Sequence, residues 1–163
     1  MPHIMMKYKF LFFALVAFVF VSCDLNTVAS PTVDVSRSHY RTTAAGVKDT
    51  ITYTDSLNIG DTVLVPILCD GRFDYLRMVK IGADTTKLRV SLLWDEKFQS
   101  CLTADADPEH GCLAFKADSV YRCYTSIKYI PKASGTHRID IVLLSAAKEG
   151  YSNGAWHFNV AVK

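Results

Sequence analysis

The sequence predicts an all-β protein built as one antiparallel β-sandwich of seven to eight strands. Between residue 47 and the C-terminus, apolar and polar residues alternate with the period of two that is typical of half-buried strands, and helical periodicity is almost absent. Turn-forming pairs such as Asp70-Gly71 punctuate these segments at short intervals. About 130 residues follow the N-terminal segment, enough for one hydrophobic core and too few for two ordinary domains.

The first half of this region contains three expected strands and one central proline. Residues 47–54 mix β-branched and polar residues, which indicates an edge strand. After a turn at 58–61, residues 62–69 form a strand whose inward face carries Val63, Val65, Ile67 and Cys69. Pro66 cannot donate a ladder hydrogen bond, so we expect an edge or a bulge there. Residues 73–81 form the next strand, and its facing is ambiguous because apolar residues occupy both faces.

The second half contains four more expected strands. Residues 87–94 alternate clearly, and this pattern places Trp94 in the core with Leu88, Val90 and Leu92. Residues 121–130, 136–145 and 155–162 complete the sandwich. The inward face of the first of these should carry Tyr121, Cys123, Thr125, Ile127 and Tyr129.

The N-terminal 23 residues have the layout of an export signal. Lys7 and Lys9 precede twelve apolar residues at 10–21, a run shorter than the roughly 20 residues of a membrane-spanning helix. Phe20-Val21-Ser22-Cys23 then resembles the lipobox of bacterial lipoproteins. The resemblance implies removal of residues 1–22 as a signal peptide and lipidation of Cys23, palmitate included. It also implies export to the bacterial cell envelope and lipid anchoring in its outer membrane.

The predicted domain organisation follows from this N-terminus. Residues 23–35, rich in small and polar side chains, should form the lipidated N-terminus and a flexible tether, and residues 36–163 the sandwich. The alternative is an ordinary signal peptide cleaved elsewhere, with Cys23 unmodified. Removal of the signal peptide takes Lys7 and Lys9 away, so the mature chain has 16 basic and 16 acidic residues and a formal net charge of zero. Nucleic-acid binding is therefore not expected.

The region from 47 to 162 resembles an immunoglobulin-like sandwich. The resemblance is carried by the Gly60-Asp61 turn before a buried strand and by the closing pair of strands joined through the Gly-containing loop 149–154. It implies that the second and fifth strands run antiparallel side by side. Cys69, at the end of one, would then meet Cys123, at the start of the other.

Four cysteines besides Cys23 are an even number, which in an exported protein indicates disulfide bonds. The immunoglobulin-like resemblance pairs Cys69 with Cys123. Cys101 and Cys112 bracket a short polar loop, so we expect a second bond across the base of a hairpin. The alternative is four free thiols, buried or bound to a metal, although the sequence lacks the Cys-x-x-Cys pairs of typical zinc sites.

The polar loop at 102–111 is the one candidate metal site. Asp105, Asp107 and Glu109 alternate there, and carboxylate oxygens on a constrained loop are the ligands that calcium prefers. The loop lacks the spacing and glycine of a twelve-residue calcium loop, so a solvated acidic loop is the alternative. Apart from calcium, no cofactor is expected.

The sequence favours binding over catalysis. It has no Gly-x-Ser-x-Gly turn, His-Glu-x-x-His motif or glycine-rich phosphate loop, so no enzyme is predicted. Sandwich loops and strand edges are common recognition surfaces, and we interpret Tyr75, Tyr124 and Tyr151 as aromatic faces for sugar rings.

The layout of a lipoprotein with such a domain is similar to the glycan-capturing surface subunits of gut-type Gram-negative bacteria. Our hypothesis is therefore a surface-anchored, non-catalytic binding module for glycan capture at the bacterial envelope. The first alternative is a structural or assembly subunit that docks onto another envelope protein through an edge strand or a sheet face. The second alternative is an inert spacer.

Overall fold

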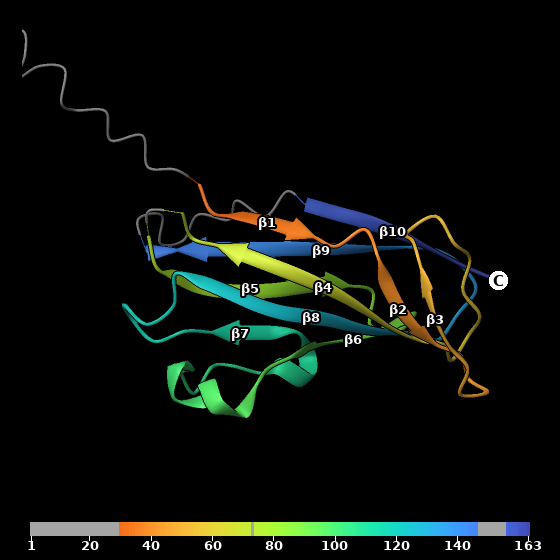
Figure 1. The fold of residues 1–163 in the computed structure, drawn as a ribbon, viewed down its shortest axis with the longest axis horizontal. Coiled ribbons are helices and arrows are strands. Elements are labelled where there is room, and N and C mark those ends of the chain that lie inside the picture. Colours follow the sequence, from red (N-terminus) through yellow and green to blue (C-terminus); the bar gives the residue numbers. More distant parts are fainter. Residues whose placement is uncertain (1–29, 73, 147–155) are drawn as a thin grey trace, which may run out of the picture.

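The computed structural model describes residues 30–72, 74–146 and 156–163, and within them it confirms the predicted antiparallel sandwich (Figure 1). The larger sheet has the strand order β3-β2-β4-β8-β6, and β1 also pairs with β4. Its strands are β1 (Thr32–Val35), β2 (His39–Thr42), β3 (Lys48–Ile51), β4 (Thr62–Asp70), β6 (Leu88–Leu93) and β8 (Arg122–Pro131). The smaller sheet has the order β10-β9-β5-β7, with β5 (Leu76–Ala83), β7 (Cys112–Ala114), β9 (Gly135–Ser145) and β10 (Trp156–Val162).

Ten strands occur in the described residues, where the sequence predicted seven to eight. The three that were missed, β1, β2 and β7, have only three or four residues each, too few for a period of two to be recognised. Two short 3-10 helices, η1 (Glu96–Cys101) and η2 (Pro108–His110), connect β6 to β7. No helix in the described part of the chain is long and apolar enough to span a membrane.

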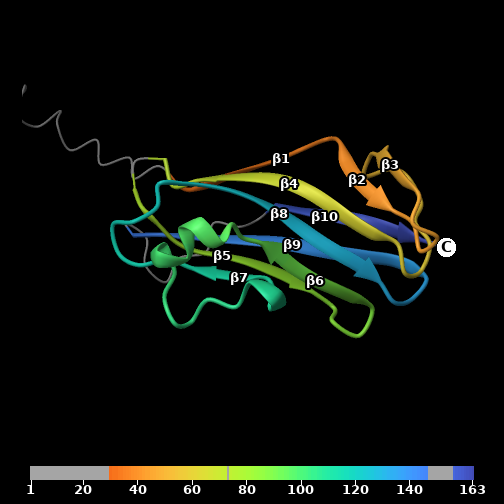
Figure 2. The ribbon, with the colours of Figure 1, turned by 60° about the horizontal axis from the view of Figure 1, so that its bottom comes forward.

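The core lies between the two sheets, whose ribbons Figure 2 shows after a turn of 60°. The predicted inward residues at 63–69 of β4 and Leu88, Val90 and Leu92 of β6 are buried, and so are Ile139, Ile141 and Leu143 of β9 and Phe158, Val160 and Val162 of β10. Trp94 packs against the edge of this core, with its ring centroid 5.6 Å from that of Phe115. A β-bulge between Leu76 and Met78 explains the ambiguous facing of β5, because it shifts the alternation by one residue.

Pro66 does not mark an edge, contrary to expectation, since β4 lies inside the larger sheet. The Ser36 N–H donates to the Pro66 carbonyl at 2.9 Å, so the backbone of Pro66 faces away from β8. On that side β1 pairs with residues up to Ile67, and β2 begins pairing at Leu64. The missing N–H of Pro66 therefore falls in the gap between two partner strands, where it costs no ladder bond. The predicted edge at 47–54 is correct, since β3 ends the sheet.

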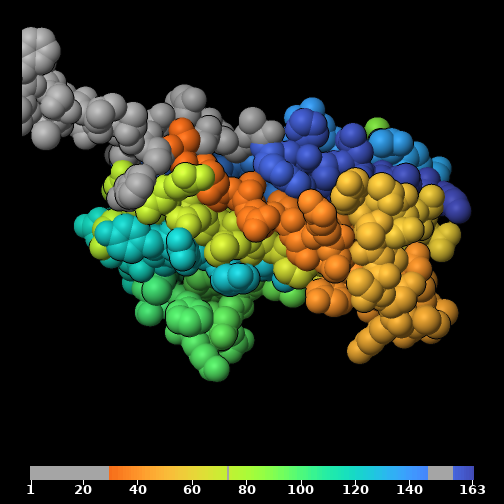
Figure 3. All heavy atoms as spheres, turned by 45° about the horizontal axis from the view of Figure 1, so that its top comes forward, coloured from red at the N-terminus to blue at the C-terminus, as the bar shows by residue number. Residues whose placement is uncertain are grey.

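The N-terminal part of the sandwich begins earlier than residue 36. The last residues of the expected tether, Thr32–Val35, form β1 and pair with Asp70 to Ile67. In Figure 3, orange β1 lies on the surface between yellow-green β4 and blue β10. Residues 1–29, including the lipobox and Cys23, lie outside the described residues.

The turn at 58–61 is held by a buried carboxylate. Asp61, 1% exposed, accepts the N–H of Asn58 at 3.0 Å and the N–H of Ala44 at 3.3 Å. The left-handed φ of Gly60, 87°, closes the turn, and a side chain there would be strained. The Asp61 carboxylate thus connects two segments: the turn that precedes β4 and the loop between β2 and β3.

Asp61→Ala should lower the free energy of unfolding by about 1–3 kcal/mol, because it removes a buried carboxylate and leaves two part-buried N–H groups without their acceptor. Urea denaturation measures the loss. Asp105→Ala, at an exposed loop position, is the control and should leave the midpoint unchanged. Equal midpoints for the two variants would show that the Asp61 carboxylate does not hold this turn.

Candidate binding site

Two connections meet at the end of the sandwich where β4 finishes and β8 begins. The Gly71 N–H donates to the Tyr121 carbonyl at 2.9 Å, and the Leu76 N–H donates to the Val120 carbonyl at 2.7 Å. A Cβ atom at Gly71 would lie 2.0 Å from the Asp74 carbonyl oxygen, so only glycine fits this approach. The β4–β5 and β7–β8 connections are therefore fixed to each other through their backbones.

An aromatic pair lies across these two connections. The rings of Tyr75 and Tyr121 stack with centroids 3.8 Å apart and an interplanar angle of 26°. Tyr121 is 48% exposed, so its inward orientation, expected from the alternation of residues 121–130, is wrong. The reason is that β8 begins only at Arg122, and Tyr121 still belongs to the connection. A hydrogen bond with the Tyr75 hydroxyl raises the pKa of Tyr121 above its ordinary value.

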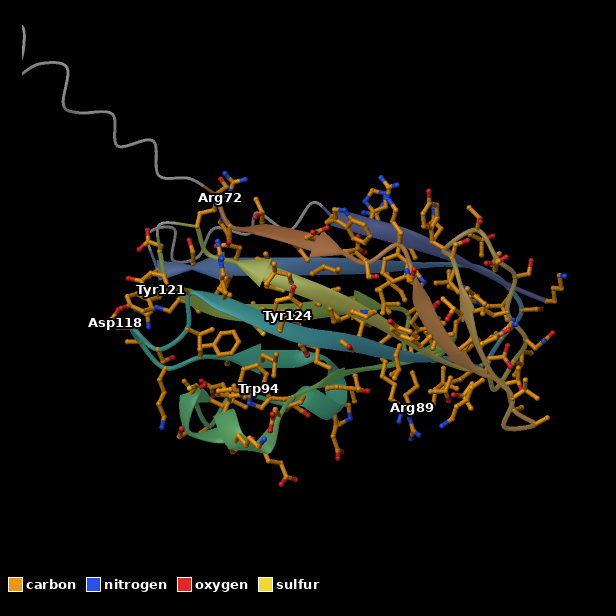
Figure 4. The ribbon with its side chains drawn as sticks, in the orientation of Figure 1. Arg72, Arg89, Trp94, Asp118, Tyr121 and Tyr124 are labelled. Carbon is orange, nitrogen blue, oxygen red and sulfur yellow. The ribbon has the colours of Figure 1, made fainter. Side chains whose placement is uncertain are left out.

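Charged residues hold the backbone beside this pair. Asp70 and Arg122 face each other in register, and Arg122 Nε donates to Asp70 Oδ2 at 2.7 Å. The Arg72 N–H donates to Asp70 Oδ1 at 2.6 Å, and this backbone hydrogen bond, with Arg122 in addition, lowers the pKa of the Asp70 carboxyl. Arg72 and Asp118 both have left-handed φ values, 63° and 53°. Non-glycine residues in this conformation cluster at functional sites, and here one lies in each connection (Figure 4).

Tyr124 lies three residues further along, on the outer face of the larger sheet (Figure 4). It is 79% exposed and stands opposite Leu68 of β4. Exposed Leu93 of β6 is its diagonal neighbour, because Leu93 pairs with Ser126. Tyr75, Tyr121 and Tyr124, which we call the tyrosine site, thus offer aromatic surface at a sheet end that several backbone hydrogen bonds make rigid.

Two of the three predicted ligand-binding tyrosines, Tyr75 and Tyr124, lie in this site. Tyr151 lies outside the described residues. Sequence reasoning assigned Tyr121 to the core, although the polar Asp118 and Ser119 just before it indicate that the strand starts later.

The three residues of the predicted calcium site are not grouped together in the structure. Within the described residues, no three acidic, histidine or cysteine side chains are arranged to hold a metal ion. Asp107 caps η2 instead: its Oδ1 accepts the His110 N–H at 3.2 Å, and its Oδ2 lies 2.8 Å from His110 Nδ1. Alternation along the chain did not bring Asp105 and Glu109 to the same point as Asp107, because a helical turn intervenes.

The four cysteines in the described residues have free thiols, and they fall into two different cases. Cys69 and Cys123 are buried and directly opposite each other on β4 and β8, in the arrangement that the resemblance implied. Burial raises the pKa of the Cys123 thiol to about 12, and burial next to Cys123 raises that of Cys69 as well. A bond between these two stays a prediction.

The expected Cys101–Cys112 bond does not fit the observed register. The Cys101 carbonyl accepts the N–H of Lys116, whereas Cys112 is bridged to Asp107. Lys116 is therefore the residue opposite Cys101, and Cys112 lies four residues away from it, about 13 Å along an extended chain. Disulfides need Cα atoms closer than about 7 Å. The observed register therefore does not allow the predicted bond between Cys101 and Cys112, and this corrects the sequence prediction.

The fold defines the class of this protein as a two-sheet antiparallel β-sandwich domain. No family model matches the sequence, and no curated protein matches it. Among solved structures, the chain is similar to a cohesin module from the family 33 glycoside hydrolase of Clostridium perfringens ATCC13124. The TM-score is 0.41 and the sequence identity 9%, with 85% of this chain and 98% of that chain covered.

Proposed function

We propose that this protein is a non-catalytic binding module, exported and anchored through Cys23 to the bacterial envelope, and that it captures glycans with the tyrosine site. The observation that carries the proposal is Tyr124, 79% exposed on a strand inside a six-stranded sheet. Tyr124 and its diagonal neighbour Leu93 together expose apolar surface on the outer face of the sheet, and grouped exposed apolar residues mark ligand-binding or interaction sites. Sugar rings have apolar faces that stack on aromatic side chains.

The neighbouring groups support the same function. Stacking on Tyr75 restricts the motion of Tyr121, so less side-chain entropy is lost when a ligand binds. Asp118 lies beside Tyr121 (Figure 4) and supplies a polar group next to the rings, while Asp70, in the adjoining connection, is already oriented by Arg122. A small number of oriented polar groups around an aromatic surface is the usual composition of a small-ligand site.

Tyr124→Ala should weaken binding to a glycan by about tenfold or more. Burying such a ring contributes roughly 1.5–3 kcal/mol, and 1.4 kcal/mol is a factor of ten in affinity. A glycan array identifies the ligand for the wild-type protein, and calorimetry measures its affinity. Tyr121→Ala should show a smaller loss, because half of that ring is already covered.

Tyr53→Ala is the matched control, since Tyr53 is comparably exposed but lies between β3 and β4, away from the tyrosine site. Equal losses from Tyr53→Ala and Tyr124→Ala would contradict the assignment of the site. An empty array together with a co-purifying envelope protein would favour the second function, docking through an edge strand. The edge strand for that function would be β3, where Lys48 is the kind of edge charge that prevents unwanted pairing.

A further inference from the structure

A groove lies on the outer face of β6 and β8, beside η2. Its volume is about 510 Å³, which is within the usual range for ligand pockets. The sheet side of the groove is lined by Arg89, Val90, Ser91, Lys128, Ile130 and Lys132. Glu109 and His110 of η2, together with Thr85 and Leu88, also line the groove.

The charges in this groove are predominantly positive. Arg89, Lys128 and Lys132 face one carboxylate, Glu109, while His110 is bound to Asp107. Lys132 Nζ donates to the Thr85 carbonyl at 3.0 Å. In the ranges that the structure describes, neither Arg89 nor Lys128 takes part in an ion pair.

The strand register brings these two free cations together. Arg89 pairs with Ile130, and Ser91 pairs with Lys128. Arg89 and Lys128 are therefore diagonal neighbours on one face of the sheet, with backbones about 7–8 Å apart. This separation lets one anionic group, or two on adjacent units of a polymer, contact both side chains.

The groove is continuous with the surface that carries exposed tyrosines. Lys128 lies on the same face of β8 as Tyr124, four residues along, a distance of about 13 Å. In the other direction, the register places Tyr40, Leu64, Lys128 and Ser91 in one row across β2, β4, β8 and β6. Figure 4 shows Tyr124 and Arg89 at separate points along this side of the sandwich.

We infer that the ligand is an acidic polysaccharide whose carboxylate or sulfate groups bind Arg89 and Lys128 while a neighbouring sugar ring covers Tyr124. The inference rests on the proposed function, because it takes the ligand to be a carbohydrate. Guanidinium binds carboxylate and sulfate through two parallel hydrogen bonds, and lysine adds a second positive charge. The hydroxyls of Thr85 and Ser91 are donors and acceptors for sugar hydroxyls in the same groove.

The test uses three polymers and the purified exported protein. Polygalacturonate supplies carboxylates, dextran sulfate supplies sulfates, and dextran is neutral. We expect the wild-type protein to bind at least one acidic polymer at least about tenfold more tightly than dextran, and to bind it less tightly as sodium chloride rises. The acidic polymer that binds identifies which of the two anions the groove takes.

Arg89→Gln/Lys128→Gln should weaken this binding by about tenfold or more and remove most of its salt dependence. Lys48→Gln/Lys116→Gln is the control, because it removes the same charge from positions outside the groove. Circular dichroism should show that both variants are folded. An unchanged affinity in the Arg89/Lys128 variant, or an equal loss in the control, overturns the inference.

Two further outcomes separate this inference from the proposed function. Binding of dextran equal to that of the acidic polymers, abolished by Tyr124→Ala, would retain glycan capture and reject the anionic subsite. Binding to none of the polysaccharides in the array would reject both. Polyglutamate binding that depends on Arg89 but not on Tyr124 would overturn the carbohydrate assignment and indicate an acidic protein partner.

Discussion

Produced in an oxidising compartment, the protein should contain a Cys69–Cys123 disulfide, and Cys69→Ala/Cys123→Ala should lower its free energy of unfolding by about 2–4 kcal/mol. The two residues are direct cross-strand partners, and such partners have Cα atoms about 4.5–5.5 Å apart. This distance is within the range of disulfide geometry. The bond would join residues that are 54 positions apart in the chain, so it would restrict the unfolded chain strongly.

The measurement must unfold the protein first. Because both thiols are buried and their pKa values are raised, neither should react with an alkylating reagent in the folded state. Alkylation in denaturant without reductant should label only Cys101 and Cys112, and prior reduction should add Cys69 and Cys123. Labelling of all four thiols without reductant would show that the bond is absent.

The matched variant is Cys101→Ala/Cys112→Ala, at two half-buried positions that the register keeps apart. It should shift the urea midpoint much less than the Cys69/Cys123 variant does. Reductant should lower the stability of the wild-type protein and of this control, but leave the Cys69/Cys123 variant unchanged. A stability loss that is the same with and without reductant would indicate packing of the two side chains instead of a bond.

Ile127→Ala should have a comparable effect, a loss of about 2–5 kcal/mol. Ile127 is fully buried and pairs with Val65 on one side and Leu92 on the other, which makes an apolar row across β4, β8 and β6. Removing three carbons from the middle of this row leaves a cavity that the two neighbouring strands cannot close without breaking their ladders. Chemical denaturation measures the loss.

Ser126→Ala, one residue earlier on the opposite face of β8, is the control for Ile127 and should change stability by no more than about 0.5 kcal/mol. Loss of stability in both variants would show that the outer face of β8 is also packed in the folded protein. That result would conflict with the open groove described above. Ile127→Ala at wild-type stability would contradict the position of the core.

The sequence predicted the long strands because their burial alternates over six or more residues. It placed Cys69 opposite Cys123 through the immunoglobulin-like resemblance, and the register agrees. Short strands were missed, since β7 has three residues and no period can be read from them. Tyr121 was placed in the core because the boundary of β8 was set one residue too early, and the alternation of the strand does not extend into the connection before it.

The groove was not predicted from the sequence, for a different physical reason. Arg89 and Lys128 are 39 positions apart, and only the pairing of β6 with β8 makes them neighbours. The residues of the predicted calcium site show the opposite case. Asp105, Asp107 and Glu109 are close in sequence, but η2 turns the chain between them and Asp107 binds His110. The periodicity of a sequence predicts which residues of one strand face the core. It does not predict which strands are adjacent, and the composition of a site depends on that adjacency.

The position of β1 sets how the domain would stand on a membrane. Thr32 is opposite Asp70, so the chain enters the sandwich at the end that carries Tyr75 and Tyr121. With a lipid on Cys23, the seven residue steps to Ser30 reach at most about 25 Å, which keeps this end close to the bilayer. Lys128 then lies about 13 Å further from the tether than Tyr124. A polymer bound along β8 would approach the lipid surface end-on, and β3 and the Gly60 turn would project outward.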